Sequence, residues 1–377
     1  MLKKIYFTVG PSQTYPTLPK HFVSALKEDI PSLNHRGAEF KKLYADTVSN
    51  LRNILAIPKT HQVFFVSSAL EGMERTIQGV VEKNSFHLIS GSFGASWMKI
   101  AEQLGKKTTS VILSEAKNIN KISSKGTSFS EAAATSPSAR NDVLVAVPKE
   151  AEVICITQND TSTGIFIPEK EITELKKQNP DVLMAIDVVS SVPLLNLDFK
   201  YIDITFFSVQ KGFGLPAGLG VMVVSPEALE KAERVMGKGV SIGSYHSLLN
   251  LSEKAKDNQT PETPNVLNIY LFNKVLKDML KKGIGKIKKD TALKAKLFYD
   301  FFEKHKKYTP FVKNIDFRSP TTLVIDTPGE SVKLRKKLAE KGFIVGAGYG
   351  DMKENQIRIA NFPSHSIQDV RNLLKLI

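Results

Sequence analysis

The feature that most constrains the fold is a series of short apolar runs between residues 40 and 225, separated by segments with helical spacing. The runs are apolar at successive positions, whereas a strand with one solvent-exposed face alternates between apolar and polar residues. Strands buried on both faces and separated by helices form mainly parallel sheets that helices cover. The sequence therefore predicts an α/β fold on such a sheet, with strands at 62–66, 86–89, 152–156, 182–186, 203–207 and 219–224.

A smaller α+β unit is predicted after this region. Residues 268–282 have the apolar spacing of an amphipathic helix. Beyond them, strand-like and helical patterns alternate at 322–325, 331–341, 356–359 and 367–377. The stretch 257–265 is rich in turn residues and separates the two regions. We therefore predict an N-terminal arm (1–18), a large domain (19–256) and a small C-terminal domain (257–377), with a loop or weak helix in the polar stretch 123–141.

Composition disfavours several classes of protein. The single cysteine, Cys155, rules out an intramolecular disulfide and a cysteine-based zinc site, and its apolar neighbours predict an inert core thiol. The seven histidines form no ligand pair at helical spacing, so we expect no metal. No apolar run approaches the roughly 20 residues that span a bilayer, and the first residues do not resemble a secretion signal. We expect a soluble, cytoplasmic protein with no membrane partner.

The formal charge of +14 is unevenly distributed along the chain. Residues 256–377 hold 24 Lys and Arg against 13 Asp and Glu, a net charge of +11, and the first 255 residues hold the other +3. The densest basic run, 281–296, contains no aromatic residue of the kind that stacks on bases, which favours a solvated helical face. We therefore expect no nucleic-acid partner, although a protein that binds nucleic acid through this region is the rival function.

Two polar segments follow neighbouring strands of the predicted sheet. Asp187 lies at the carboxyl end of one apolar run, and Lys211 follows the next run, before a glycine-rich turn. Ligands of open α/β sheets bind beyond the carboxyl ends of strands, and the 24-residue separation allows a crossover between adjacent strands. Such a pair suits pyridoxal phosphate, because a lysine forms a Schiff base with its aldehyde and an acid keeps its ring nitrogen protonated. Taken singly, Asp187 is better explained as a helix cap and Lys211 as a surface cation.

Two more strand ends favour the cofactor interpretation. The segment 159–164 (Asn-Asp-Thr-Ser-Thr-Gly) follows a buried strand and supplies hydroxyls and amides at the same sheet edge. The segment 67–74 follows the strand at 62–66 and is predicted to open a helix. Small residues and free amides at a helix start bind anions, so this segment suits a cofactor phosphate. Four polar strand ends in one domain favour a shared site over isolated caps.

Several motifs support a family resemblance. They are a Gly-Pro segment at 7–11, His-Arg at 35–40, Asn-Asp-Thr at 159–161, the lysine segment at 210–219 and an arginine at 358. Along nearly the whole chain these resemble the class V aminotransferases, most closely the phosphoserine aminotransferase group, which has Asn-Glu-Thr at the third position. The resemblance implies a fold-type I pyridoxal phosphate-dependent transferase with a large and a small domain, acting as a homodimer with its sites at the subunit interface.

The resemblance also implies a role for each matching residue. Lys211 would carry the cofactor and shuttle a proton to and from the substrate, and Asp187 would pair with the pyridinium nitrogen. Arg358 would hold the substrate α-carboxylate with its planar fork. His35 and Arg36 would bind a second anion on the substrate side chain. The further cofactor-binding residues would be Ser68, Ala69, Leu70, Phe93, Thr161, Ser190, Gln210 and Thr263, of which Ser68, Ala69 and Gln210 contact the phosphate.

Two departures from the group's pattern bear on the substrate and the cofactor. Phe93 takes the position of a tryptophan that stacks on the cofactor, and Trp97 lies four residues later on a predicted helix. The segment normally contributed by the partner subunit, Asn-Thr-Pro-Pro-Thr, reads Glu-Thr-Pro-Asn-Val at 262–266. An acid at Glu262 would repel a substrate phosphate. This stretch also resembles that of alanine–glyoxylate and serine–glyoxylate aminotransferases.

The predicted function is therefore a transaminase that exchanges an amino group between an amino acid and a 2-oxo acid. Phosphoserine with 2-oxoglutarate, a reaction of serine biosynthesis, is the first choice of substrates. Alanine or serine with glyoxylate is the alternative within the same chemistry.

Overall fold

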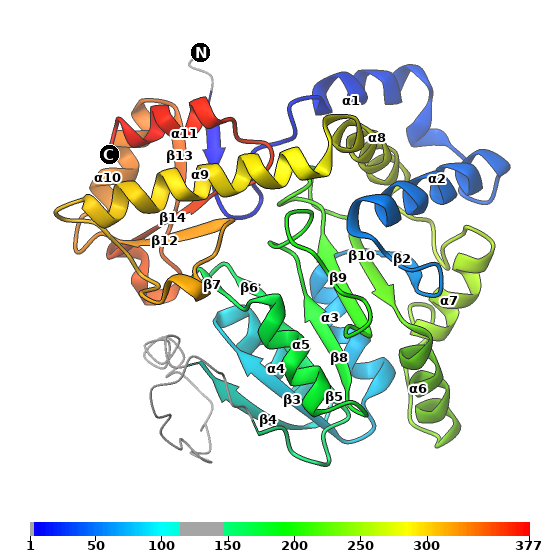
Figure 1. Ribbon diagram of the computed structural model, residues 1–377. Helices are drawn as coiled ribbons and strands as arrows, with labels where there is room; N and C mark the ends of the chain where they lie inside the picture. The colour runs from blue at the N-terminus through cyan, green and yellow to red at the C-terminus, as the bar shows by residue number, and fades with distance from the viewer. Residues whose placement is uncertain (1–3, 114–145) are drawn as a thin grey trace.

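The computed structural model describes residues 4–113 and 146–377 (Figure 1). Its largest element is a seven-stranded sheet in the order β2-β10-β9-β8-β5-β3-β4. Neighbouring strands are parallel except for β10, which runs antiparallel to both β2 and β9. The strands are β2 (Gln62–Val66), β3 (Asn84–Ile89), β4 (Lys107–Ile112), β5 (Val153–Thr157), β8 (Leu183–Asp187), β9 (Ile204–Ser208) and β10 (Gly220–Val224).

The prediction of a mainly parallel sheet buried on both faces is confirmed. All six predicted runs are strands, and all six are buried at nearly every position. The seventh strand, β4, escaped the sequence analysis because it lies at the edge of the sheet and alternates between exposed and half-buried polar residues.

Alternate residues of the strands point into two cores on opposite faces of this sheet. In β5, Ile154 and Ile156 belong to one core, while Val153 and Cys155 belong to the other. The core thiol predicted for Cys155 is thus confirmed, and burial raises its pKa. The helices α2 (Ala38–Leu55), α5 (Glu169–Gln178) and α8 (Val266–Lys282) contribute to the first core. The helices α3 (Ala69–Val80), α4 (Ser92–Gln103), α6 (Pro226–Gly237) and α7 (Leu248–Lys256) contribute to the second.

A second sheet contains the described N-terminal strand and the C-terminal strands, in the order β1-β13-β14-β12-β11. Its first strand pairs in parallel with β13, so the beginning of the chain joins its end (Figure 1). Three helices pack on this sheet around a separate core. The strands are β1 (Ile5–Phe7), β11 (Thr309–Pro310), β12 (Thr322–Asp326), β13 (Phe343–Ala347) and β14 (Gln356–Ala360), and the helices are α9 (Ile284–Lys304), α10 (Ser331–Glu340) and α11 (Ile367–Leu374).

The remaining elements are short, apart from α1 (Leu18–Lys27), which packs against α8. They are the hairpin β6 (Asn159–Asp160) and β7 (Ile165–Phe166) and the 3₁₀ turns η1 (Ile30–Ser32), η3 (Ile315–Phe317) and η4 (Gly350–Glu354). The predicted loop at 123–141 lies outside the described residues. The domain boundaries at 18 and 256 stay predictions. None of the helices in the described ranges is both long and apolar enough to cross a membrane.

The basic run 281–296 covers the end of α8 and the first half of α9. Its expected solvated face does not include Lys294, which is 1% exposed. The ammonium of Lys294 donates hydrogen bonds to the carbonyls of Phe362 and His365, at 2.8 and 2.9 Å. Lys294 is buried because it lies on the same face of α9 as Ile287 and Phe298, the face that packs inward. This lysine is therefore a structural residue.

Candidate active site

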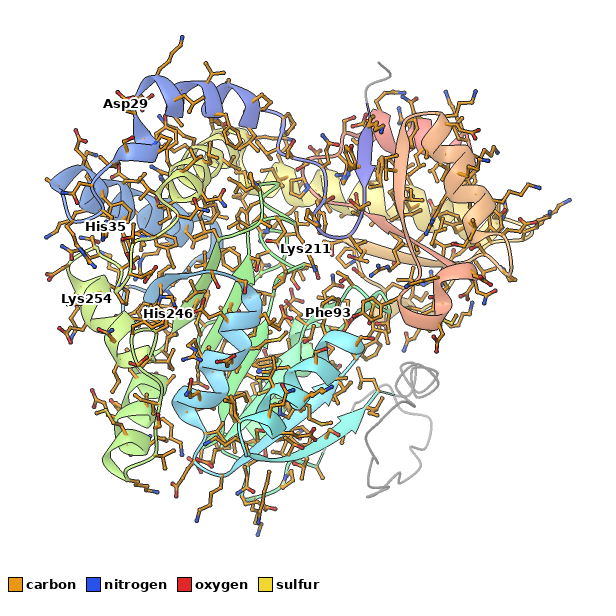
Figure 2. The ribbon with its side chains drawn as sticks, turned by 180° about the vertical axis from the view of Figure 1, so that it is seen from behind. Asp29, His35, Phe93, Lys211, His246 and Lys254 are labelled. Carbon is orange, nitrogen blue, oxygen red and sulfur yellow. The ribbon has the colours of Figure 1, made fainter. Side chains whose placement is uncertain are left out.

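Asp187 and Lys211 lie at the same edge of the large sheet. Asp187 is the last residue of β8, and Lys211 follows the end of the neighbouring strand β9, with which β8 pairs in parallel. The predicted crossover thus brings both residues to the carboxyl ends of adjacent strands. Figure 2 shows Lys211 and Phe93 close to each other, between the large sheet and the C-terminal sheet.

Lys211 is buried with few polar partners. Its side chain is 9% exposed, and its Nζ atom lies 3.5 Å from the Thr161 hydroxyl and 5.3 Å from the centre of the Phe93 ring. Burial lowers the pKa of Lys211 to about 8, although the nearby carboxylates of Asp187 and Asp160 oppose this shift. A lysine in this state has an appreciable fraction of neutral, nucleophilic amine near neutral pH.

The backbone near the N-terminus lines the lysine. Gly10 has φ +144°, which favours glycine, and a Cβ atom added there would lie 2.7 Å from the Lys211 Cε atom. The amide of Ser12 donates a hydrogen bond to the Gln210 carbonyl. The Gly-Pro segment identified through the resemblance therefore packs against Lys211.

Asp187 is buried behind the lysine and is only partly satisfied. One carboxylate oxygen accepts a hydrogen bond of 2.9 Å from the Val189 amide, and the other accepts one of 3.4 Å from the Thr157 hydroxyl. Burial raises the pKa of Asp187 to about 6, while the Val189 hydrogen bond and Lys211 lessen the shift. A cation placed against this carboxylate would restore its ionised form.

Asp160 holds the start of α4 in place. One of its oxygens accepts hydrogen bonds from the amides of Phe93 and Gly94, and the other accepts from the amide and hydroxyl of Ser162. A Cβ on Gly91 would lie within 2.6 Å of this carboxylate, so glycine is required there. The sequence analysis noted this acid only as a replacement for Glu. The structure shows that it binds the backbone amide of Phe93, whose ring lies beside Lys211.

Trp97 does not reach the site. It is fully buried in the core beneath α4, packs edge-on against Phe206, and donates its indole N–H to the Met73 carbonyl. Phe93 is therefore the aromatic side chain of α4 that lies beside Lys211, in agreement with its expected position.

Arg358 reaches the same site from the C-terminal sheet. It lies on β14, donates its Nε–H to the Ala347 carbonyl at 2.7 Å, and donates an Nη1–H to the Thr161 carbonyl at 3.0 Å. The Tyr349 ring lies 5.4 Å from the guanidinium carbon and 5.9 Å from the Phe93 ring centre. Tyr349 thus connects Arg358 with Phe93. The sequence analysis missed it because its position depends on a contact between distant segments of the chain.

Ser190 and Gln210 differ in how far the protein satisfies them. The Ser190 hydroxyl donates to the backbone carbonyl of Asn159 and accepts from the side-chain amide of Asn159, both at 2.7 Å. The Thr321 hydroxyl donates to the backbone carbonyl of Ser190. Ser190 is therefore committed to a network that ties the large sheet to the C-terminal sheet. In contrast, the buried Oε1 atom of Gln210 finds no hydrogen-bond partner within the described ranges.

The start of α3 borders a cavity of about 730 Å³. Ser68 caps the helix by accepting a hydrogen bond from the Glu71 amide, and the Ala69 amide donates to the Ser208 hydroxyl at 2.6 Å. Leu70 lines the cavity and is 61% exposed. Thr263 lines it from the other side. Ser68, Leu70 and Thr263 therefore line one cavity, whereas Gln210 and Lys211 are not among the residues that line it.

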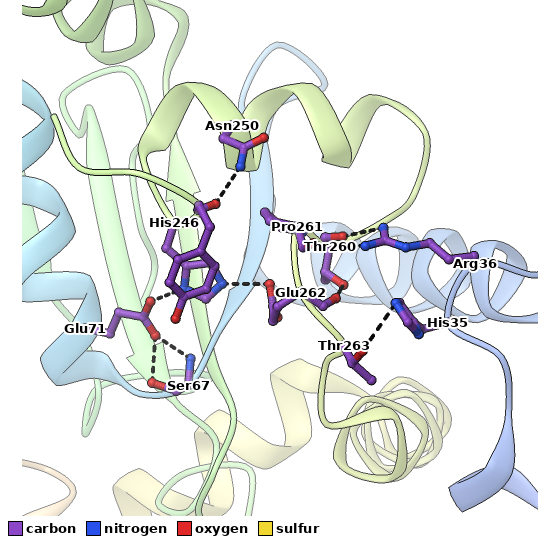
Figure 3. Close-up of polar contacts among 11 residues, drawn as sticks. His35, Arg36, Ser67, Glu71, His246, Asn250, Thr260, Pro261, Glu262 and Thr263 are labelled. Carbon is purple, nitrogen blue, oxygen red and sulfur yellow. Dashed lines mark hydrogen bonds and ion pairs between the residues drawn. The ribbon is translucent and has the colours of Figure 1, made fainter.

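His35 and Arg36 contact the segment 259–263, which we call the strap. Arg36 donates hydrogen bonds to the carbonyls of Thr260 and Pro261 at 2.6 and 2.9 Å and to the Gln259 side chain at 3.0 Å. The His35 ring lies 3.5 Å from the Thr263 hydroxyl (Figure 3). Figure 2 shows His35 well apart from Lys211. Within one chain, the structure thus separates the two residues expected to bind a second substrate anion from Lys211 and Arg358.

Glu262 is paired with a histidine that the sequence analysis did not identify. The Nε2 atom of His246 lies 2.7 Å from Glu262, and its Nδ1 atom contacts Glu71 (Figure 3). Burial would lower the pKa of His246, but the hydrogen bonds with Glu262 and Glu71 outweigh burial and raise the pKa to about 9. The acid expected to repel a substrate phosphate is therefore half of an ion pair.

Three comparisons with known proteins agree with this geometry. The family model described as "Aminotransferase class-V" matches residues 17–352. The solved structure of a phosphoserine aminotransferase from Cytophaga hutchinsonii is 40% identical with a TM-score of 0.90, covering 100% of this chain and 98% of that chain. A curated phosphoserine aminotransferase from Corynebacterium glutamicum is 25% identical, covering 97% of this chain and 92% of its own length. The family match spans most of the chain, and the chain therefore belongs to the class-V aminotransferases, a family of fold-type I enzymes.

Proposed function

We propose that this protein is a pyridoxal phosphate-dependent aminotransferase whose reactive residue is Lys211. The observation that carries the proposal is a buried lysine with a lowered pKa beside a buried acid, Asp187, at the carboxyl ends of two adjacent parallel strands. The described residues fit this cofactor. The Phe93 ring and Gly10 lie against the lysine, and the buried Oε1 atom of the adjacent Gln210 has no partner within the described ranges.

When bound, pyridoxal phosphate supplies an aldehyde that condenses with amines and a ring that accepts electrons from the substrate α-carbon. Lys211 supplies the amine that holds the cofactor, and its neutral form takes a proton from the α-carbon and returns it. The lowered pKa of Lys211 suits it to both tasks, because proton transfer is most efficient when the pKa lies near the working pH.

The neighbouring residues divide the remaining work. Asp187 would hold a positive charge at the ring nitrogen with its buried carboxylate, and Phe93 would cover one face of the ring. Arg358 is oriented by two carbonyl groups and by Tyr349, which leaves its second terminal nitrogen available for a substrate carboxylate. Thr161 connects Lys211 with Arg358 through its hydroxyl and its carbonyl.

For the substrates, we propose phosphoserine and 2-oxoglutarate, which would place the enzyme in serine biosynthesis. This choice is supported by the name of the Cytophaga hutchinsonii relative, 40% identical over the whole chain, and by that of the Corynebacterium glutamicum relative. Alanine or serine with glyoxylate is the second candidate. One observation favours it: Arg36, expected to bind the substrate phosphate, already donates to three acceptors of the strap.

We further propose a cytoplasmic homodimer with its sites at the subunit interface, built from the predicted large and small domains. Two exposed side chains, Leu70 and Tyr245, border the cavity at the start of α3, and a partner subunit would cover them.

Half-reactions test the substrate assignment. Phosphoserine, serine, alanine and glutamate are added separately to the cofactor-loaded enzyme, and loss of the visible absorbance of the lysine-bound cofactor is followed. We expect phosphoserine and glutamate to react fastest. A phosphoserine rate no greater than that of serine would refute the phosphoserine assignment, and a fast alanine reaction would support the glyoxylate alternative. No reaction with any amino acid would count against the proposed activity itself.

A further inference from the structure

His246 joins two segments of the chain through both nitrogens of its ring. Its Nδ1 atom contacts Glu71 of α3, and its Nε2 atom lies 2.7 Å from Glu262 of the strap (Figure 3). A neutral imidazole carries one N–H and donates to only one acceptor, so its second nitrogen would present a lone pair to a carboxylate. The geometry therefore indicates an imidazolium that donates to both acids.

Both acids line the cavity at the start of α3. The second oxygen of Glu71 accepts hydrogen bonds from the amide and hydroxyl of Ser67, both at 2.7 Å, so Glu71 holds the turn between β2 and α3. Glu262 belongs to the strap, where its carbonyl accepts a hydrogen bond of 2.8 Å from the Thr260 hydroxyl. Through His246, one imidazolium fixes the position of the strap relative to the turn.

The same contacts determine the charge of the cavity wall. Glu71 and Glu262 bring two negative charges to a cavity that is also lined by Ser68, which the family resemblance predicts to contact the phosphate of the cofactor. His246 offsets one of these charges. The other ionised groups that line the cavity, Glu74 and Arg75, pair with each other. Without the imidazolium, two uncompensated carboxylates would face an incoming phosphate dianion.

We propose that His246 is a positioning residue for the cofactor phosphate: by bridging Glu71 and Glu262, it holds the strap against the turn before α3 and reduces the negative charge of the cavity there. This inference rests on the proposed use of pyridoxal phosphate. It also explains how a strap that carries an acid at position 262 is compatible with an anionic ligand.

The test compares pyridoxal phosphate with pyridoxal, which has the same aldehyde and ring but no phosphate. Dissociation constants of both are measured with the full-length protein freed of cofactor, for wild type, H246Q, the double variant H246Q/E262Q and the control H21Q. His21 is a suitable control because it also binds a carboxylate, that of Asp278 at 2.6 Å, but on α1 and α8. Borohydride reduction and peptide mapping confirm that each aldehyde is attached to Lys211.

We expect H246Q to raise the dissociation constant of pyridoxal phosphate at least about tenfold, because the uncompensated carboxylates repel the phosphate. The dissociation constant of pyridoxal, which has no phosphate, should change little. The second substitution, E262Q, should recover most of the lost affinity by removing one of those charges, and H21Q should resemble wild type. Equal losses for both aldehydes in H246Q, or no recovery in the double variant, would mean that His246 is only structural and would overturn the inference.

The two levels of the argument fail in different ways. If wild type attaches either aldehyde to Lys211, but H246Q loses the same affinity for both aldehydes, the inference about His246 is wrong and the proposed function stands. If wild type attaches neither aldehyde, the proposed function and the inference that rests on it are both wrong.

Discussion

The site around Lys211 and the strap region around His246 each contain a buried cation, and the pKa values of these two cations are shifted in opposite directions. Lys211 has one distant hydroxyl partner, at 3.5 Å, and burial lowers its pKa to about 8. His246 has a carboxylate at each ring nitrogen, and these hydrogen bonds raise its pKa to about 9 although it is also buried. Burial alone therefore does not decide whether a cation is reactive. The number and charge of its partners decide it.

Two arginines repeat this contrast. Arg36 gives three hydrogen bonds to the strap and thereby fixes backbone, whereas Arg358 gives two to carbonyl groups and keeps donors available. From this comparison we expect substitutions around Lys211 to change chemistry and substitutions around the strap to change binding and stability.

The largest effect is expected for Lys211→Ala. Without the amine, neither cofactor attachment nor proton transfer at the α-carbon can proceed, so turnover should fall by a factor on the order of 10³ or more. Steady-state rates with glutamate as amino donor measure this loss. Circular dichroism and thermal unfolding provide the control for folding. A variant that retained a tenth of the wild-type rate would break the contrast between the two regions.

Asp187→Asn ranks second. The amide keeps the shape of the side chain but cannot offset a positive charge at the ring nitrogen, a loss of about 3 kcal/mol for a buried pair, or roughly 100-fold in rate. The matched control is Asp203→Asn, which removes a buried acid paired with Lys176 at 3.0 Å, outside the site. We expect that variant to lose stability while its rate per folded molecule stays near wild type. Equal rate losses in the two variants would contradict the assigned role of Asp187.

A smaller effect is expected for the arginines, compared as Arg358→Lys and Arg36→Lys. Lysine cannot reproduce the planar fork, so the Arg358 variant should raise the KM of every amino acid at least about tenfold. The Arg36 variant should chiefly affect doubly anionic substrates and the stability of the strap. KM values for phosphoserine, serine and alanine separate these outcomes. If the Arg36 variant raised all three to the same extent as the Arg358 variant, the division into two regions would be wrong.

The residues predicted from the sequence are those whose position depends on one strand and its end. Asp187, Lys211 and Thr161 follow buried strands, and parallel strands necessarily bring such ends to one edge. The periodicity of the strands therefore predicted both the sheet and its reactive edge. Arg358 was identified through its motif, and the C-terminal sheet brings it to the Thr161 carbonyl.

The residues that sequence reasoning missed depend on contacts between distant segments. His246 contacts Glu71, which lies 175 positions away in the sequence, and no local sequence pattern indicates such a partner. Tyr349 acquires its position only when the C-terminal sheet packs beside α4. Lys294 counted as part of a basic run, yet the face of α9 on which it lies packs inward. The other lysines of that run are exposed or half-buried, so the solvated face predicted from the charge holds for all of them except Lys294.

The central claim is that Lys211 is the reactive lysine, and a pair of buried lysines allows a direct test. Burial lowers the pKa of Lys294 to about 7, yet its ammonium is fixed by two carbonyls in a structural position. Wild-type protein is incubated with pyridoxal phosphate between pH 6 and 10, reduced with borohydride and mapped by mass spectrometry.

We predict a yellow protein labelled at Lys211 and not at Lys294. Because the pKa of Lys211 is lowered from 10.5 to about 8, its amine loses its proton as the pH rises through 8, so the initial labelling rate should rise across that range. An ordinary lysine would still be more than about 99% protonated at pH 8. Protein that stays colourless, or label found at Lys294 or scattered over surface lysines, would contradict the account.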